Sequence, residues 1–193
     1  MRLSILLPKR FPAITLFVIF FICVIHAIPG SFDLFYYNSE LFYQGQWWRL
    51  FTSQLVHLNL NHLGYNVGGI LILGWLLEQD FRTHIVPLLL CGIIGVGIFL
   101  PLGSLWRYCG LSGAIAALLM PVVWSLWQKE GGLIPWLVAA IYLARLIVEL
   151  IIDKPIIVDL DWPSYPPAHL VGMAIGACWV GIRVYKRRTL SAQ

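Results

Sequence analysis

Long apolar stretches separated by short polar ones limit most strongly what this chain can fold into. A helix of about 20 apolar residues is long enough to cross a lipid bilayer. Six runs approach that length, and they cover residues 11–29, 60–78, 84–102, 111–128, 133–152 and 167–185. We therefore expect an all-α fold, a polytopic membrane protein with six transmembrane helices in a single domain over residues 1–193.

The composition also indicates that the bilayer is the main solvent of this chain. Hydrophobic residues make up 60% of the sequence and charged residues only 11%, whereas an ordinary soluble domain has about 25% charged residues. So little polar surface could not cover a water-soluble core of this size. The composition excludes a secreted globule, a nucleic-acid-binding module and a disordered linker.

The first apolar run could be a secretory signal peptide or a retained helix. It is as long as a membrane span, and Ile28-Pro29-Gly30 is a poor cleavage site. We therefore expect a retained transmembrane helix.

The basic residues predict the orientation of the helices. They gather at the two ends of the chain, as Arg2, Lys9, Arg10, Arg183, Lys186, Arg187 and Arg188. Because basic flanks favour the cytoplasmic side, we expect both termini in the cytoplasm, which requires an even number of spans. The net charge of +4 then reflects topology and not a nucleic-acid partner. This arrangement is typical of a multi-pass protein of a bacterial inner membrane.

The segment from residue 31 to residue 61 is long for a connection between helices and is rich in aromatic residues. Trp and Tyr favour the headgroup zone of a membrane. We expect a structured first outer loop that lies partly in that zone. For most of its aromatic residues, the alternative is a membrane-interface belt with no further role.

The four cysteines, Cys23, Cys91, Cys109 and Cys178, are scattered and form no C-x-x-C motif. We expect neither a disulfide framework nor a metal site, and no cofactor.

Polar residues at membrane depth are informative because they are costly there. His62 and Asn66 lie near the outer end of the second run. They are four residues apart, so they share a helix face and can both donate hydrogen bonds from it. The alternative is that they only join neighbouring helices by hydrogen bonds.

A serine lies in the segment Gly110-Leu111-Ser112-Gly113, where the fourth run begins. The N-terminus of a helix has unpaired N–H groups and a positive partial charge, so it can stabilise an anion beside Ser112. The alternative is that Ser112 is a simple N-cap.

A histidine opens the sixth run, and two glycines follow it on the same side of the helix. Gly172 and Gly176 form a GxxxG pair, which lets another helix approach closely. If that helix is the fourth, which is rich in small residues, His169 meets Ser112 at the same depth. Partial burial disfavours imidazolium, so His169 would be a neutral base. A serine with a histidine is the minimum for nucleophilic catalysis.

Together these residues resemble the rhomboid family of intramembrane serine proteases. The matching pieces are Trp48-Arg49, His57 with His62 and Asn66, Gly110 to Gly113, and Ala168-His169 with Gly172 and Gly176. Their order and spacing are similar to those of the six-helix rhomboid core over about residues 45–180. The resemblance implies a serine endopeptidase that cleaves membrane-anchored proteins near the extracytoplasmic face without a cofactor.

The resemblance also implies a role for each residue. Ser112 would be the nucleophile and His169 the general base. His62, Asn66 and the backbone N–H of Ser112 would form the oxyanion hole. The residues with implied structural roles are Trp48, Arg49, His57, Gly110, Gly113, Gly172 and Gly176.

The chain departs from the family pattern one turn after the serine. Many rhomboids carry an aromatic residue there that packs on the catalytic histidine, but this chain has Ala116. Another residue must therefore support His169. Cys109, three residues before Ser112, has no sequence neighbour that would activate its thiol.

Within the family, the small core with almost no tails is similar to the rhombosortase branch. Members of that branch cleave a C-terminal anchor made of Gly-Gly, a helix and a basic tail. Arg145 and Glu149 match the basic and acidic pair that this branch places in its fifth helix. The pair could recognise substrate, or the two charges could simply neutralise each other inside the bundle.

Two other functions are compatible with parts of the sequence. A non-catalytic rhomboid-like protein would bind membrane clients, although such relatives usually lack the serine or the histidine. A haem or metal protein could use His57, His62 and His169, although no acid or cysteine completes a metal shell at helical spacing. The expected partners are membrane-anchored protein substrates and the lipid bilayer, not nucleic acid.

Overall fold

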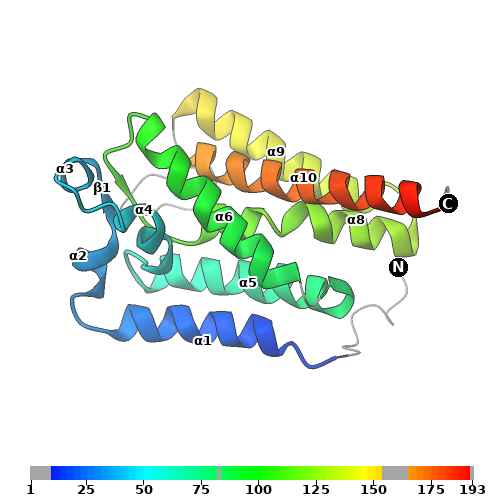
Figure 1. The fold of residues 1–193 in the computed structure, drawn as a ribbon, viewed down its shortest axis with the longest axis horizontal. Coiled ribbons are helices and arrows are strands. Elements are labelled where there is room, and N and C mark those ends of the chain that lie inside the picture. The colour runs from blue at the N-terminus through cyan, green and yellow to red at the C-terminus, as the bar shows by residue number, and fades with distance from the viewer. Residues whose placement is uncertain (1–9, 82–83, 154–164, 192–193) are drawn as a thin grey trace.

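The long helices of this protein lie side by side in a bundle. The computed structural model describes residues 10–81, 84–153 and 165–191, so Arg2 and Lys9 of the orientation prediction lie outside the described residues. The helices of the bundle are α1 (Ala13–Ala27), α5 (Leu60–Phe81), α6 (Ile85–Phe99), α7 (Ser112–Ala116), α8 (Leu119–Glu130), α9 (Ile134–Ile152) and α10 (Pro166–Ser191) (Figure 1).

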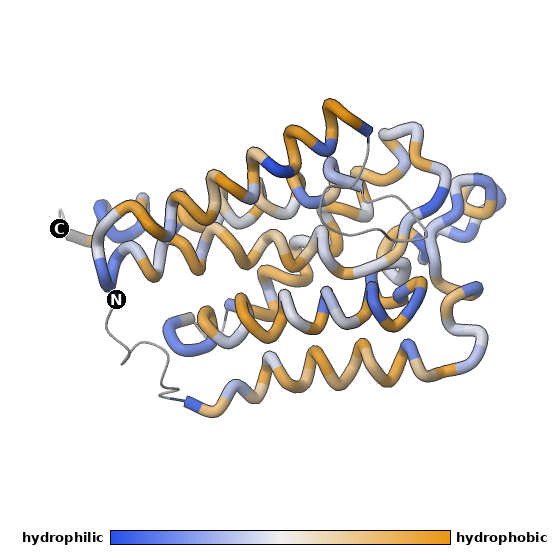
Figure 2. The backbone as a smooth tube through the Cα atoms, turned by 180° about the vertical axis from the view of Figure 1, so that it is seen from behind, coloured by the Kyte–Doolittle hydropathy of each residue, from blue (hydrophilic) through white to orange (hydrophobic). Residues whose placement is uncertain are grey.

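Several of these helices can cross a membrane. In the part of the chain that the structure describes, four segments are long and apolar enough, namely Leu60–Asp80, Ile85–Leu102, Ile134–Ile152 and Pro166–Leu190. The apolar helix α1 is shorter. Figure 2 shows hydrophobic residues along the helices and hydrophilic residues gathered toward the two ends of the bundle. The chain is a multi-pass helical membrane protein, while the number of six spans stays a prediction.

Within the predicted helix over residues 111–128, the structure has two helices, because a turn at Ala117 and Leu118 separates α7 from α8. At this turn the N–H groups of Ala117 and Leu118 donate three residues back, over 3.1 and 2.9 Å, which is the tighter 3-10 pattern. Pro121 explains the break, since it has no N–H to donate to the carbonyl group of Ala117. That carbonyl oxygen faces Gly176 of α10 instead.

The outer segment between α1 and α5 is folded. Its short elements are α2 (Ser31–Phe35), β1 (Tyr37–Asn38), α3 (Ser39–Tyr43), α4 (Arg49–Thr52) and the 3-10 turn η2 (Ser53–Leu55). A further 3-10 turn, η4 (Leu100–Leu102), follows α6. Strand β1 pairs antiparallel with β2 (Arg107–Tyr108), so that Tyr37 lies opposite Tyr108. The all-α prediction did not include this small sheet, which joins the outer segment to the chain just before Ser112.

Helix α10 lies at the centre of the half of the bundle that contains His169. It contacts α6, α7, α8 and α9, whereas α1 packs mainly on α5. Figure 1 shows α1 and α9 at opposite edges of the bundle. The arrangement leaves the N-terminal turn of α10 beside the start of α7.

A buried carboxylate holds α1 against α5. Glu78 of α5 accepts hydrogen bonds from the backbone N–H groups of Ile14 and Thr15, each over 3.0 Å. It also accepts one from the Thr15 hydroxyl over 2.8 Å. The first N–H groups of a helix lack acceptors within the helix and carry positive partial charge, so the carboxylate is stabilised there.

The start of α1 and the end of α10 lie at the same end of the bundle (Figure 1). Arg10, just before α1, and Arg187 of α10 line one hollow there. This geometry is the one expected for an even number of membrane crossings.

Candidate active site

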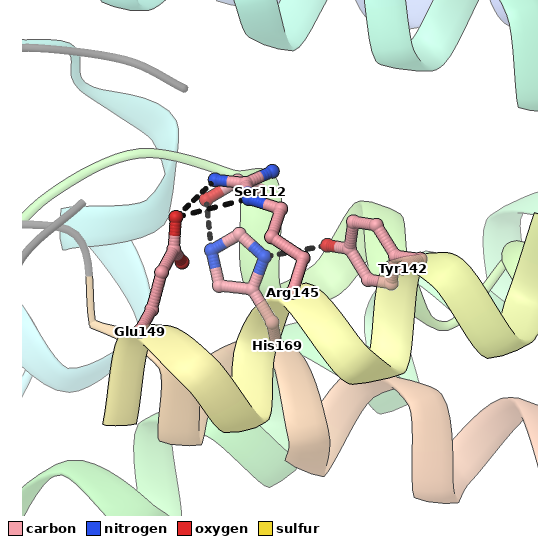
Figure 3. A network of polar contacts seen from close by, with 5 residues as sticks. All are labelled: Ser112, Tyr142, Arg145, Glu149 and His169. Carbon is pink, nitrogen blue, oxygen red and sulfur yellow. Dashed lines mark hydrogen bonds and ion pairs between the residues drawn. The ribbon is translucent and has the colours of Figure 1, made fainter. Parts of the chain in front are cut away.

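Ser112 and His169 come together where α7 and α10 begin. Ser112 is the first residue of α7, and His169 lies in the first turn of α10. The Oγ atom of Ser112 lies 3.2 Å from Nε2 of His169 (Figure 3). This is within hydrogen-bond reach of a nucleophile and its base.

The two helices approach closely because glycines line their contact. A Cβ atom added to Gly172 would overlap the carbonyl oxygen of Gly113 and would lie 3.1 Å from the Cβ of Ala116. One added to Gly176 would overlap the carbonyl oxygen of Ala117. The GxxxG pair thus packs on the small residues of the fourth apolar run, and this packing sets the separation of Ser112 from His169.

The second ring nitrogen of His169 contacts a residue that the sequence reasoning missed. The phenolic oxygen of Tyr142, on α9, lies 2.6 Å from His169 Nδ1 (Figure 3). The two rings are tilted by 37°, with centroids 6.2 Å apart. The aromatic support absent at Ala116 is therefore supplied from a different helix. Its only signal in the sequence is a tyrosine one turn before Arg145 in an otherwise apolar run.

His62 lies against the loop that leads to Ser112. Gly110 has a φ of +97°, and a Cβ atom added to it would overlap Nε2 of His62. Glycine is therefore required here both for the left-handed backbone and for the space that the imidazole fills. On the other side of the ring, Nδ1 of His62 lies 3.8 Å from the sulfur of Cys109.

Asn66 is buried one turn further along α5, on the same side as His62. Its Nδ2 group donates to the carbonyl oxygen of His62 over 2.9 Å. That bond uses one of the two N–H groups of the amide. Among the described residues, neither Asn66 nor His62 forms a hydrogen bond with Ser112.

A comparison with protein families matched the Rhomboid domain over residues 44–186. The match covers most of the chain and includes every predicted site residue from Trp48 to Gly176. The chain belongs to the rhomboid family. Rhomboids are generally intramembrane serine proteases, and some members are inactive. A search of curated proteins found no match.

An ion pair accompanies the histidine in this rhomboid. Arg145 and Glu149, one turn apart on α9, meet through Nε and Nη2 of the guanidinium and Oε1 of the carboxylate, each over 2.9 Å. The Glu149 side chain is 1% exposed and that of Arg145 22%. Figure 3 places the pair beside Ser112 and His169. The ion pair expected from their spacing is present.

His57 packs against His62 and is itself buried. The two rings meet edge to face with centroids 5.3 Å apart. Burial, with a smaller contribution from His62 and His26, lowers the pKa of His57 to about 3. His57 therefore stays neutral at physiological pH and acts as a packing partner of His62.

Cys109 is also buried beside the site. Burial raises the pKa of its thiol to about 12, so thiolate is scarce near neutral pH. Because thiolate is the nucleophilic form, Cys109 is a poor nucleophile near neutral pH.

The rhomboid Trp-Arg pair lies in the outer segment. The guanidinium of Arg49 is buried and donates to the Gln46 side chain over 2.8 Å and to the carbonyl oxygens of Asp33 and Tyr36 over 2.9 and 2.8 Å. Trp48 is 40% exposed. Arg49 thus joins several turns of the segment, while the indole of Trp48 faces outward.

The outer segment reaches the loop that leads to Ser112 through a backbone hydrogen bond. The N–H of Gly110 donates to the carbonyl oxygen of Ser53 over 3.0 Å. With the β1–β2 pair, this bond fixes the chain just before Ser112.

No group of three or more His, Cys, Asp or Glu residues able to hold a metal ion occurs among the residues that the structure describes.

Proposed function

We propose that this rhomboid is an active intramembrane serine endopeptidase, with Ser112 as nucleophile and His169 as general base. The observation that carries the proposal is the separation of 3.2 Å between Ser112 Oγ and His169 Nε2. A base within hydrogen-bond reach of the nucleophile is the arrangement that acyl transfer requires. Rhomboid-like proteins that only bind clients have no need for this pair.

In the proposed reaction, Ser112 Oγ attacks the carbonyl carbon of a peptide bond as its proton passes to Nε2 of His169. The tetrahedral intermediate collapses, the C–N bond breaks, and the leaving amine takes that proton. A water molecule then gives a proton to Nε2 and attacks the acyl ester. The acid product leaves, and Ser112 regains its proton.

Tyr142 is proposed to set the tautomer and the orientation of His169. Catalysis needs the lone pair of Nε2 to face Ser112, so the ring proton must lie on Nδ1. The phenolic oxygen of Tyr142, 2.6 Å from Nδ1, can accept a hydrogen bond from that N–H. This contact would do for the base what a carboxylate does in a serine protease triad.

The developing oxyanion is proposed to be bound by three donors. The N–H of Ser112 opens a helix and has no acceptor within it. The side-chain amide of Asn66 has a second N–H besides the one that donates to the carbonyl oxygen of His62. The third donor is His62. Its Nδ1 atom faces the protonated thiol of Cys109, so the ring proton would lie on Nε2, beside the loop that leads to Ser112. Removing one such donor typically costs about 10²–10³ in rate.

The proposed substrates are membrane-anchored proteins, cut near the extracytoplasmic face. A peptide bond within a helix is shielded, so the outer end of the anchor must unwind. Glycine assists this, because it costs a helix about 1 kcal/mol relative to Ala. We further propose C-terminal Gly-Gly anchors of the rhombosortase type. The ion pair of Arg145 with Glu149 beside the dyad supports this narrower class.

The proposed topology has six spans and two cytoplasmic termini in a bacterial inner membrane. In this count α1 is the first span, and α7 with α8 together form the fourth. The basic flanks and the common position of the two ends support it. The site then opens to the outside, where water for hydrolysis is available.

Co-expression with a helix-anchored reporter tests the function. We expect cleavage of a reporter with a C-terminal Gly-Gly anchor, and no cleavage by Ser112→Ala. Ser104→Ala is a matched control, because Ser104 is exposed in the preceding loop. It should cleave like the wild type.

The outcomes separate the candidate functions. Cleavage by Ser112→Ala at the wild-type rate would overturn the dyad. Capture of the reporter without cleavage by the wild type would favour a client-binding protein. Equal cleavage of a reporter with Leu-Leu in place of Gly-Gly would overturn only the narrower substrate class.

A further inference from the structure

We infer that the end of the bundle opposite the dyad carries a binding site for the phosphate of an anionic phospholipid headgroup. A hollow of about 290 Å³ lies there, between Arg10, just before α1, and helices α5, α8 and α10. The residues that line it are Arg10, Gln79, Asp80, Trp124, Ser125, Gln128, Lys129 and Arg187. None of them belongs to the dyad or its supports.

The charges of the hollow favour an anion. Three cationic side chains from separate segments line it, with Asp80 as the only acid among the described residues that do so. Both oxygens of Asp80 are engaged, one by Lys129 Nζ over 2.6 Å and the other by the hydroxyl of Ser125. Asp80 therefore compensates Lys129, and the charges of Arg10 and Arg187 stay in excess.

The protein holds the side chain of Arg187 and the backbone of Arg10 in place. The guanidinium of Arg187 lies over the indole of Trp124, 4.9 Å from the ring centroid. The backbone N–H of Arg10 donates to the Gln79 side chain over 3.0 Å, and the Gln79 amide donates back to the carbonyl oxygen of Arg10 over 3.2 Å. An anion that binds both guanidinium groups would therefore meet one that is already positioned, that of Arg187, which lowers the entropic cost of binding.

The position of the hollow indicates that the anion belongs to a lipid. The hollow lies where membrane-spanning helices end, beside a tryptophan, which is the depth of the headgroups. A second arginine–tryptophan contact, Arg183 over Trp179 at 5.0 Å, lies one turn before Arg187 on α10. Basic pockets between transmembrane helices on the cytoplasmic side bind anionic headgroups. A bound headgroup would join Arg10, just before α1, to the end of α10.

Thermal unfolding of the full protein in a neutral detergent tests this site. Phosphatidylglycerol should raise the unfolding temperature by a few degrees, because a ligand that binds only the folded state stabilises it. Phosphatidylcholine and inorganic phosphate should not. The shift should shrink in Arg10→Gln, which lies outside every helix, and disappear when Arg187→Gln is added. Arg188→Gln removes the same charge from the neighbouring position, which does not line the hollow, and should keep the shift.

Three results would overturn the inference. Equal stabilisation by phosphatidylcholine would indicate general lipid solvation. Equal loss of the shift in Arg188→Gln would indicate that the lipid responds to the overall charge of this end of the bundle and not to a specific site. A full shift with inorganic phosphate alone would identify a free-phosphate site. Because none of these variants touches Ser112 or His169, the outcome is independent of proteolytic activity.

Discussion

The phenolic oxygen of Tyr142 lies 2.6 Å from Nδ1 of His169, while Ser112 contacts the other ring nitrogen. The imidazole is thus held between two hydroxyl groups that come from different helices. Since α7, α9 and α10 each contribute one of these three residues, the packing of the helices determines whether the dyad is aligned.

Tyr142→Phe removes the phenolic oxygen and keeps the ring. We expect kcat to fall about tenfold, because a hydrogen bond of about 1–1.5 kcal/mol to the base is lost. The KM should stay unchanged, since Tyr142 is not proposed to touch substrate. Steady-state cleavage of a reporter in detergent measures both. Tyr65→Phe, at an exposed position of α5, is the control, and a Tyr142→Phe enzyme with wild-type kcat would show that the contact has no role.

Gly172→Ala tests the contact of α10 with α7. Its Cβ atom would overlap the carbonyl oxygen of Gly113, and overpacking of this kind costs about 1–3 kcal/mol. We expect a lower unfolding temperature and loss of activity, because the helices must separate. Gly181→Ala on the same helix has nothing within 4 Å of the added atom. It should be neutral or slightly stabilising, and equal behaviour of the two variants would contradict the packing account.

Asn66→Ala tests the proposed oxyanion hole. We expect kcat to fall by about 10²–10³ with little change in KM, because the donor acts on charge that develops in the transition state. The unfolding temperature of the variant shows whether the loss is structural. A folded variant that retains nearly all of its kcat would remove Asn66 from the mechanism.

Burial of His57 should make the stability of the protein sensitive to acid. Its pKa is about 3 in the folded protein, against an ordinary value of 6.5. The unfolded chain therefore binds a proton that the folded protein excludes, so stability is complete above about pH 6.5 and falls as the pH drops toward 3. The loss amounts to a few kcal/mol.

Unfolding measured between pH 7 and 4 checks this prediction. In His57→Asn, which cannot titrate in this range, the dependence of stability on pH should be shallower than in the wild type. An identical pH profile for the two proteins would mean that another group is responsible.

Part of the site could be predicted from the sequence because glycine spacing carries structural information. Gly172 and Gly176 mark a face of α10 that another helix can approach, and the small residues after Ser112 provide the matching face. This reasoning anticipated the contact of Ser112 with His169 that the structure contains. The ion pair of Arg145 with Glu149 follows in the same way from a spacing of one helical turn.

Other features depend on packing that the sequence does not encode locally. Helix α9 is apolar over most of its surface, so no periodicity indicates that Tyr142 faces α10. The break after Ala116 lies within a continuous apolar run, and only the missing N–H of Pro121 explains it. The pairing of β1 with β2 joins residues far apart in the chain, each in a strand of two residues.

Ser112 is proposed to be a nucleophile that His169 activates. The most direct measurement is reaction of the membrane-embedded protein with a fluorophosphonate, followed by mass spectrometry of the labelled peptide. We predict one adduct per chain, on Ser112, and no adduct in His169→Ala. An unlabelled wild-type protein, or an adduct that forms equally well in Ser112→Ala, would contradict the account.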